Sequence, residues 1–129
     1  MKNVRTLIAD DEDHIRLFVK TMLIGMGCDV VAEARNGQEA IELFEQHHPD
    51  LVLLDINMPV LDGRAALQAL RTRSEEVTII MLSSLAGAEV VEDCLNAGAD
   101  YQLRKDLPLA DLRREIEQVW DSRADGLAP

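Results

Sequence analysis

The sequence has few of the features that cross-link a chain or hold it in a membrane. Its two cysteines, Cys28 and Cys94, lie far apart and outside any CxxC motif, as is typical of reduced thiols and not of a disulfide framework or a zinc site. No apolar run reaches the roughly 18 residues of a membrane-spanning helix. The first apolar run also ends at Ala9, too early for a signal peptide. We therefore expect a cytoplasmic protein that does not enter a membrane.

Basic residues are also scarce. The 129 residues include 13 Lys and Arg against 24 Asp and Glu, which gives a formal net charge of -11. Direct nucleic-acid binding is therefore disfavoured, because it depends on Lys and Arg side chains that meet phosphates. The apolar content of 47% is nevertheless ordinary for a soluble domain, and the length suits one domain with its own core. We expect that domain to cover residues 1–122, followed by a flexible tail at 123–129.

Five short apolar segments alternate with five segments of helical spacing. The apolar runs are residues 4–9, 30–34, 51–54, 77–82 and 101–103. Several are continuous and not alternating, which is typical of parallel strands buried on both faces. Short connections and right-handed crossovers then predict a doubly wound α/β fold, (βα)5, with helices on both faces of a parallel sheet. We expect the flavodoxin-like strand order 2-1-3-4-5.

A few residues mark the ends of the expected helices. Asn36-Gly37 opens the second helix, and Asp62 is suited to cap the third. The fourth helix is expected near residues 88–97, because Gly98 favours a helix end. Pro108 is suited to the start of the fifth helix.

Acidic side chains gather where the first and third strands end. The segment "TLIADDED" places Asp10 and Asp11 after the first strand, and "LVLLDINMP" places Asp55 at the end of the third. These strands are neighbours in the expected order, so the three carboxylates converge on one crevice. Such a cluster needs a cation, and oxygen ligands favour Mg²⁺ or Mn²⁺. We interpret the next acids, Glu12 and Asp13, as favourable charges at the start of the first helix.

Two further strand ends bring a hydroxyl and an amine to the same edge. The segment "IIMLSS" places Ser83 at the end of the fourth strand, and "QLRKD" places Lys105 at the end of the fifth. The Lys ammonium is a compact charge suited to a phosphate oxygen. A carboxylate surrounded by a metal ion, an amine and a hydroxyl favours phosphoryl transfer to Asp55, which would give an aspartyl phosphate.

These motifs resemble the receiver domain of two-component response regulators. The resemblance covers residues 3–121 and rests on "IADDED", "NGQEA", "DLVLLDINMPVLDG", "MLSS", "AGAD" and "RKD", in this order and at the family's spacing. It implies that Asp55 is the phosphoacceptor. It also implies that Asp10 and Asp11 hold Mg²⁺ or Mn²⁺ together with Asp55, and that Asn57 adds its backbone carbonyl. A chain of this kind would be a stand-alone signalling switch and not an enzyme with an external substrate.

The resemblance also implies roles for the other site residues and for partners. Ser83 would turn its hydroxyl toward the phosphoryl group, and Lys105 would pair with that group. The donor would be a sensor histidine kinase, a histidine phosphotransfer protein or a small acyl phosphate. The downstream protein would bind a face made of the fourth helix, the fifth strand and the fifth helix. The chain would be a monomer or a phosphorylation-dependent dimer.

The sequence departs from the family pattern around the fifth strand. The residue after Lys105 is Asp106, where the family usually has proline. The switch aromatic usually stands three residues before the lysine, but this position is Gln102, and Tyr101 lies on the opposite face of the strand. We therefore expect the usual coupling of hydroxyl and aromatic ring to be altered. The family tunes dephosphorylation at the position two residues after Ser83, and the resemblance implies that the apolar Leu85 there slows hydrolysis of the phosphoryl group.

Other classes of protein place different residues at these positions. A phosphatase of the haloacid dehalogenase type also uses a nucleophilic Asp at a strand end, but it needs a second acid where this chain has Asn57. An FMN-binding module needs a phosphate-cradling loop after the first strand, where "ADDED" would repel the phosphate. Two alternatives stay open: a degenerate receiver that binds partners without phosphorylation, and a receiver excised from a larger DNA-binding regulator.

Overall fold

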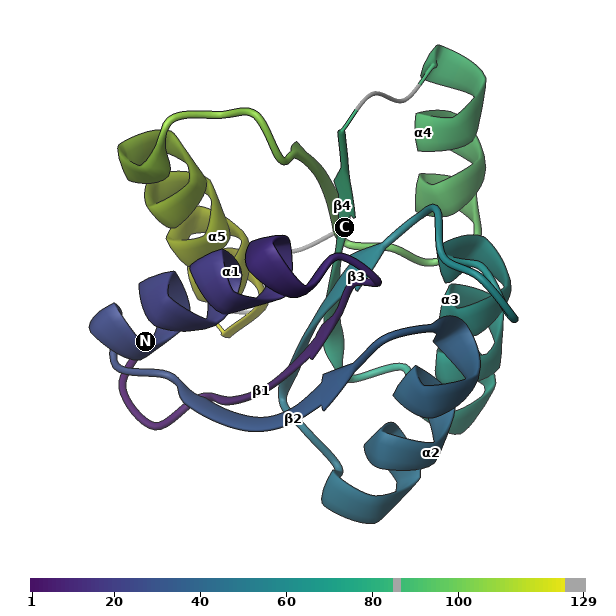
Figure 1. The fold of residues 1–129 in the computed structure, drawn as a ribbon, viewed down its shortest axis with the longest axis horizontal. Helices are drawn as coiled ribbons and strands as arrows, with labels where there is room; N and C mark the ends of the chain where they lie inside the picture. Colours follow the sequence, from purple (N-terminus) through teal and green to yellow (C-terminus); the bar gives the residue numbers. More distant parts are fainter. Residues whose placement is uncertain (85–86, 125–129) are drawn as a thin grey trace.

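The computed structural model describes residues 1–84 and 87–124. Five strands and five helices alternate along this part of the chain, as expected (Figure 1). The strands are β1 (Arg5–Ala9), β2 (Asp29–Ala34), β3 (Leu51–Asp55), β4 (Thr78–Ser83) and β5 (Tyr101–Arg104). The helices are α1 (Asp13–Gly25), α2 (Gly37–His47), α3 (Gly63–Arg73), α4 (Ala88–Asn96) and α5 (Leu109–Ala124). No strand boundary differs by more than one residue from the range that the sequence predicts.

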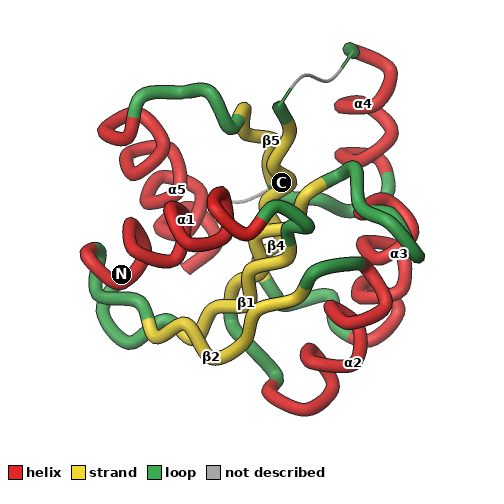
Figure 2. Tube along the Cα trace, viewed as in Figure 1, coloured by secondary structure: helices red, strands yellow, loops and turns green. Residues whose placement is uncertain are grey.

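The strands form one parallel sheet in the order β2-β1-β3-β4-β5, which confirms the predicted flavodoxin-like topology. Helices α1 and α5 cover one face of the sheet, and α2, α3 and α4 cover the other (Figures 1 and 2). The strand order reverses between β1 and β3. In an open parallel sheet, this switch point is where the carboxyl ends of the strands leave a crevice for a ligand.

The central strand β3 explains why the apolar runs are continuous. All of its residues are buried. Val52 and Leu54 pack in the core beneath α2 and α3, whereas Leu51 and Leu53 pack in the core beneath α1 and α5. A parallel strand that is covered on both faces has no side to present to water, so both alternating sets of side chains are apolar.

The cap predicted at Asp62 is present, and the helix start expected at Asn36-Gly37 is capped as well. Asn36 Oδ1 accepts a hydrogen bond of 2.8 Å from the Glu39 amide, and Asp62 Oδ1 accepts one of 2.9 Å from the Ala65 amide. Each bond satisfies a backbone donor that the first helical turn leaves unpaired. Helix α4 ends two residues before Gly98, whose φ of 110° suits glycine.

The last helix, α5, packs on the sheet through the buried side chains of Leu112 and Ile116. It continues to Ala124, beyond the domain boundary expected at residue 122, and residues 125–129 of the expected tail lie outside the described residues. None of the helices in the described part of the chain is long and apolar enough to cross a membrane.

Candidate functional site

Polar side chains follow four neighbouring strands at one edge of the sheet. Asp55 is the last residue of β3 and Ser83 is the last residue of β4. Asp10 directly follows β1, and Lys105 directly follows β5. Because the strands are parallel and in register, their carboxyl ends meet at the same edge. The structure therefore brings these residues to the same sheet edge, as the sequence pattern predicts.

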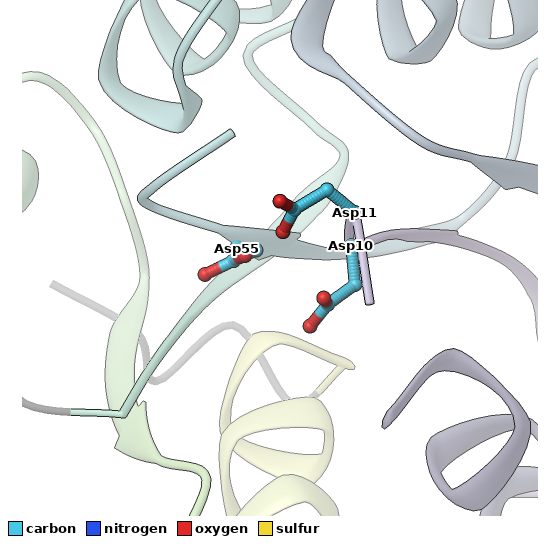
Figure 3. Close-up of side chains that lie close together, drawn as sticks. All are labelled: Asp10, Asp11 and Asp55. Atoms are coloured by element: carbon cyan, nitrogen blue, oxygen red, sulfur yellow. The ribbon is translucent and has the colours of Figure 1, made fainter. Parts of the chain in front are cut away.

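Asp10, Asp11 and Asp55 form a compact carboxylate cluster (Figure 3). One carboxylate oxygen of each residue lies within 4.8 Å of the others. Asp10 is fully buried and Asp55 is 3% exposed, whereas Asp11 is exposed. Two carboxylates thus lie at the bottom of the cluster, and the third forms its solvent side.

Lys105 supplies positive charge to this cluster. Its amine lies 2.7 Å from Asp10 Oδ2 and 3.2 Å from Asp55 Oδ2, and its side chain is 9% exposed. The carboxylate of Glu12 lies 3.6 Å from the same amine. The backbone amide of Lys105 donates a hydrogen bond of 2.7 Å to the Ser83 carbonyl, which fixes this segment beside β4. Buried carboxylates without a nearby cation are costly, so these ion pairs explain how the like charges are tolerated.

The two carboxylate oxygens of Asp10 have different surroundings. Oδ1 accepts a hydrogen bond of 2.9 Å from the Glu12 amide. Oδ2 pairs with the Lys105 amine at 2.7 Å, so each oxygen of this buried carboxylate has a donor beside it. Three carboxylates with one open side fit a hard divalent cation such as Mg²⁺.

The environment changes the protonation of both charged partners. Burial raises the pKa of the Asp55 carboxyl to about 6, the charge of Asp10 adds to this effect, and Lys105 opposes it. Burial alone would lower the pKa of the Lys105 amine, but the close contacts with Asp10 and Asp55 outweigh burial, and the pKa is raised. Lys105 therefore stays charged at neutral pH, whereas Asp55 titrates closer to neutrality than an exposed aspartate.

The loop behind Asp55 is held tightly at its far end. A Cβ atom at Gly63 would collide with the Asp55 carbonyl oxygen, so only glycine lets α3 begin this close to β3. The Gly63 amide also donates a hydrogen bond of 2.8 Å to the Ile56 carbonyl. Between these residues Val60 is 82% exposed and has a φ of 69°. A β-branched residue rarely adopts this backbone conformation, so the exposed tip of the loop is strained.

The hydroxyl of Ser83 has an unexpected partner. Ser83 is 1% exposed, and its Oγ accepts a hydrogen bond of 3.0 Å from Gln102 Nε2. Gln102 is the residue at the position of the family's switch aromatic. Tyr101 pairs with Ile80, whose side chain packs in the core beneath α1 and α5. Tyr101, which is 38% exposed, therefore lies on the face of β5 opposite to Gln102, as predicted. The alternation of side chains places Gln102 on the same face of the sheet as Met81 and Ser83. Its hydrogen bond to Ser83 also depends on the register between β5 and β4.

Glu12 lies at the start of α1, as expected, but its carboxylate also has a contact that the sequence does not predict. It occupies the N-cap position of α1, but its side chain makes no capping hydrogen bond and instead approaches Lys105. Asp13 lies in the first turn of α1, as expected, and its carboxylate pairs with Arg16 at 2.7 Å. Sequence reasoning missed the contact of Glu12, because the position of the lysine is set by a strand far along the chain.

Asn57 and Leu85 are the remaining residues for which the sequence predicts a role. Asn57 is exposed on the loop after β3, two residues beyond Asp55. Leu85, which the sequence connects with slow hydrolysis, lies outside the described residues. The roles of both residues stay predictions.

A cavity of about 670 Å³ lies at the amino ends of β3 and β4, opposite to the strand ends that carry the carboxylate cluster. Arg73 and Arg123 line it, but each already pairs with an acid, Glu45 and Asp100 respectively. None of the described residues that line it belongs to the predicted site. The carboxylate cluster therefore remains the candidate functional site.

Known proteins share this sequence pattern. The chain matches the family model of the response regulator receiver domain over residues 6–117. It is 42% identical over 95 residues to the chemotaxis protein CheY of Bacillus subtilis, which covers 74% of this chain and 79% of that protein. It is 40% identical over 113 residues to the transcriptional regulatory protein PdtaR of Mycobacterium tuberculosis. That match covers 88% of this chain but only 55% of PdtaR.

A solved structure has a similar fold. The crystal structure of the CheX-CheY-BeF3-Mg²⁺ complex from Borrelia burgdorferi matches with a TM-score of 0.88 and 28% identity. The match covers 92% of this chain and 90% of that one. The family match extends over most of the sequence, and the observed strand order agrees with it. The chain therefore belongs to the response regulator receiver domain family.

Proposed function

We propose that this protein is a phosphorylation-controlled signalling switch in which Asp55 accepts a phosphoryl group. The observation that carries the proposal is the 3.2 Å ion pair between Asp55 and Lys105 beside the acids Asp10 and Asp11. Asp55 would supply the nucleophile, and Lys105 would supply a fixed positive charge for a phosphoryl oxygen. Membership of the receiver family supports the same assignment.

The carboxylate cluster would hold Mg²⁺ or Mn²⁺. Asp10, Asp11 and Asp55 would supply carboxylate oxygens, and Asn57 would supply its backbone carbonyl. The cluster of three carboxylates supports this proposal, because the single positive charge of Lys105 does not balance their negative charge. When bound, such an ion neutralises negative charge on the phosphoryl oxygens. The presence of Mg²⁺ in the similar CheX-CheY-BeF3-Mg²⁺ complex is a further argument for this ion.

The transfer would form one bond and break one. A carboxylate oxygen of Asp55 would attack the phosphorus of a phosphohistidine or an acyl phosphate, and the bond from phosphorus to the donor would break with its electron pair on the donor. The Lys105 amine and the Ser83 hydroxyl would donate hydrogen bonds to phosphoryl oxygens. Hydrolysis would later release phosphate and restore the carboxylate. The chain would thus catalyse only its own modification and would not turn over an external substrate.

The donor would be a sensor histidine kinase or a histidine phosphotransfer protein, and the output would be contact with another protein. Helices α4 and α5 and strand β5 carry exposed apolar side chains that a partner protein could cover, namely Val90, Leu95, Tyr101 and, at the start of α5, Leu109. A new charge at Asp55 would act on Ser83 and Lys105, which end β4 and follow β5, and would thereby bias the surface of α4, β5 and α5.

The assembly around the switch is a separate part of the proposal. The chain would work as a monomer or as a dimer that forms on phosphorylation through the same surface. It would be a stand-alone regulator or the receiver part of a longer DNA-binding regulator, since it spans 79% of CheY but 55% of PdtaR. Light scattering with and without beryllofluoride distinguishes the monomer from the dimer.

Intact-mass spectrometry after incubation with acetyl phosphate tests the central claim. With Mg²⁺ we expect a gain of one phosphoryl group, and with EDTA we expect none. Asp55→Ala should abolish the gain. Asp50→Ala is the matched control, because Asp50 also borders β3 but lies at the opposite end of the strand and accepts a hydrogen bond of 3.1 Å from the Arg5 amide.

Two results would overturn this function. Labelling that persists in Asp55→Ala would move the acceptor to another residue. The absence of an adduct, together with the absence of beryllofluoride binding, would favour the degenerate receiver that binds partners without phosphorylation. Testing beryllofluoride removes the ambiguity of rapid hydrolysis, since this mimic is not hydrolysed as a phosphoryl group is.

A further inference from the structure

Gln102 is placed by strand register to reach the hydroxyl of Ser83. In the parallel pairing of β4 and β5, Gln102 lies beside Met81. Ser83 is two residues beyond Met81, so its side chain leaves the same face of β4. The Gln102 side chain bridges this offset, and its Nε2 donates a hydrogen bond of 3.0 Å to Ser83 Oγ.

This bond constrains what the hydroxyl can do next. A serine hydroxyl has one proton to donate and two lone pairs that accept. In the structure Oγ accepts from Gln102, so its proton remains available for an acceptor elsewhere. A hydroxyl that accepts a hydrogen bond also becomes a better donor, because successive hydrogen bonds polarise one another. An aromatic ring carbon at this position could not supply the same donor.

The hydrogen bond comes with a local cost in stability. The other polar atom of the amide, Gln102 Oε1, is buried and has no hydrogen-bond partner in the described part of the chain. Leaving a buried acceptor unsatisfied costs about as much as one hydrogen bond stabilises, or more. An apolar side chain of similar length would avoid this cost. The amide is therefore poorly explained as a packing residue and better explained by its contact with Ser83.

We propose that Gln102 is a positioning residue for phosphoryl binding. Its amide holds Ser83 Oγ as an acceptor and thereby directs the Ser83 proton to an oxygen of the phosphoryl group on Asp55. Gln102 itself does not touch that group. This inference rests on the proposed function. Two consecutive hydrogen bonds, from Gln102 to Ser83 and from Ser83 to the phosphoryl group, would take the place of the movement of an aromatic ring.

Beryllofluoride affinity in the presence of Mg²⁺ measures this effect directly. It can be followed by calorimetric titration of the full chain. Gln102→Met keeps the length of the side chain but removes the donor, and we expect about threefold weaker binding. Gln102→Glu replaces the donor with an acceptor that competes for the Ser83 proton, and we expect roughly tenfold weaker binding. Gln118→Glu makes the same change of charge at an exposed position of α5 and should bind like the wild type.

The same variants in a Ser83→Ala background separate hydrogen bonding from simple charge repulsion. If Gln102 acts through Ser83, its substitution has no further effect once the hydroxyl is absent. The affinity for Mg²⁺ alone should stay within about twofold for Gln102→Met, because the proposed effect concerns the phosphoryl group. Thermal unfolding serves as the check on folding, and Gln102→Met should stay close to the stability of the wild type, because it removes one unsatisfied acceptor but takes the donor from the buried Ser83 hydroxyl.

Each outcome has a definite meaning. Wild-type affinity in Gln102→Met, or an equal loss in the Ser83→Ala background, would overturn the role of Gln102 and leave the proposed function intact. Failure of the wild-type chain to bind beryllofluoride would overturn the proposed function and this inference together.

Discussion

The amine of Lys105 lies 2.7 Å from Oδ2 of Asp10, and the two side chains are only 9% and 1% exposed. This ion pair links the segment after β5 to the segment after β1, across the end of the central strand that carries Asp55. Asp10 is also a member of the carboxylate cluster. A metal ion that enters the cluster would therefore share the Asp10 carboxylate with Lys105, and charge would be redistributed without any change in the fold.

Removal of the amine should expose the cost of the buried carboxylates. In Lys105→Met, Asp10 and Asp55 lose their cationic partner, and we expect the free energy of unfolding to fall by about 3 kcal/mol in EDTA. Urea denaturation measures this change. Mg²⁺ should restore more stability to the variant than it adds to the wild type, because the cation compensates the same carboxylates.

Lys20→Met is the matched control for that substitution. Lys20 pairs with Glu33 at 3.0 Å, but its side chain is 38% exposed. An exposed ion pair contributes under about 1 kcal/mol, so this variant should lose little stability and gain nothing specific from Mg²⁺. Equal losses in the two variants would show that burial of the Lys105 pair has no particular importance.

The raised pKa of Asp55 predicts a characteristic pH dependence. Burial raises the pKa of this carboxyl to about 6, so between its unfolded value and about 6 the native state binds more protons than the unfolded state. Stability then falls as the pH rises through this range. Relative to the wild type, Asp55→Asn should therefore become more stable by roughly 2 kcal/mol between about pH 4.5 and about pH 7.5 in EDTA.

Asp13→Asn provides a control of opposite sign for the urea denaturation. A hydrogen bond from Arg16 and the charge of that guanidinium lower the pKa of the exposed Asp13 carboxylate. This group stabilises the native state above its unfolded pKa, and that contribution is lost as the pH falls through its lower native value. Asp13→Asn should thus be less stable than the wild type at neutral pH. A difference between Asp55→Asn and the wild type that does not vary with pH would contradict the assignment for Asp55.

Relief of backbone strain beside the site should increase stability. Val60 has a φ of 69° and is 82% exposed, so it has little packing to lose. Val60→Gly should raise the free energy of unfolding by about 0.5–1 kcal/mol, because the left-handed conformation costs L-residues more than it costs glycine. Val90→Gly is the contrasting variant, since Val90 lies within α4 and is 38% exposed. It should lose about 0.5 kcal/mol or more. A loss in both variants would argue against strain at Val60.

Most of the fold follows from local features of the sequence. The continuous apolar run at residues 51–54 predicts a strand covered on both faces, and β3 is buried throughout. Asn36 and Asp62 predict helix starts because capping depends on backbone donors only a few residues away. The handedness of the crossovers determines which face of the sheet each helix covers, and the observed strand order places Asp10 and Asp55 at the ends of neighbouring strands.

The chemistry at the sheet edge needs more than strand order. Glu12 has the sequence position of a helix cap, but its carboxylate lies 3.6 Å from the amine of Lys105. Gln102 has the sequence position of an aromatic switch residue, but it makes a hydrogen bond to Ser83. In both pairs the partner comes from another segment of the chain. The local backbone of Glu12 or Gln102 allows several side-chain rotamers, so it does not select the one that reaches the partner.

The sequence by itself determined the alternation of strands and helices, the caps and the set of polar residues at the strand ends. These depend on periodicity, on backbone conformation and on the common direction of parallel strands. The tertiary structure alone decided which charges meet, which oxygen of Asp10 pairs with Lys105, and which hydroxyl Gln102 contacts. Those relationships depend on register, burial and side-chain rotamers across strands, because electrostatic and hydrogen-bond energies change over a few tenths of an ångström to a few ångströms.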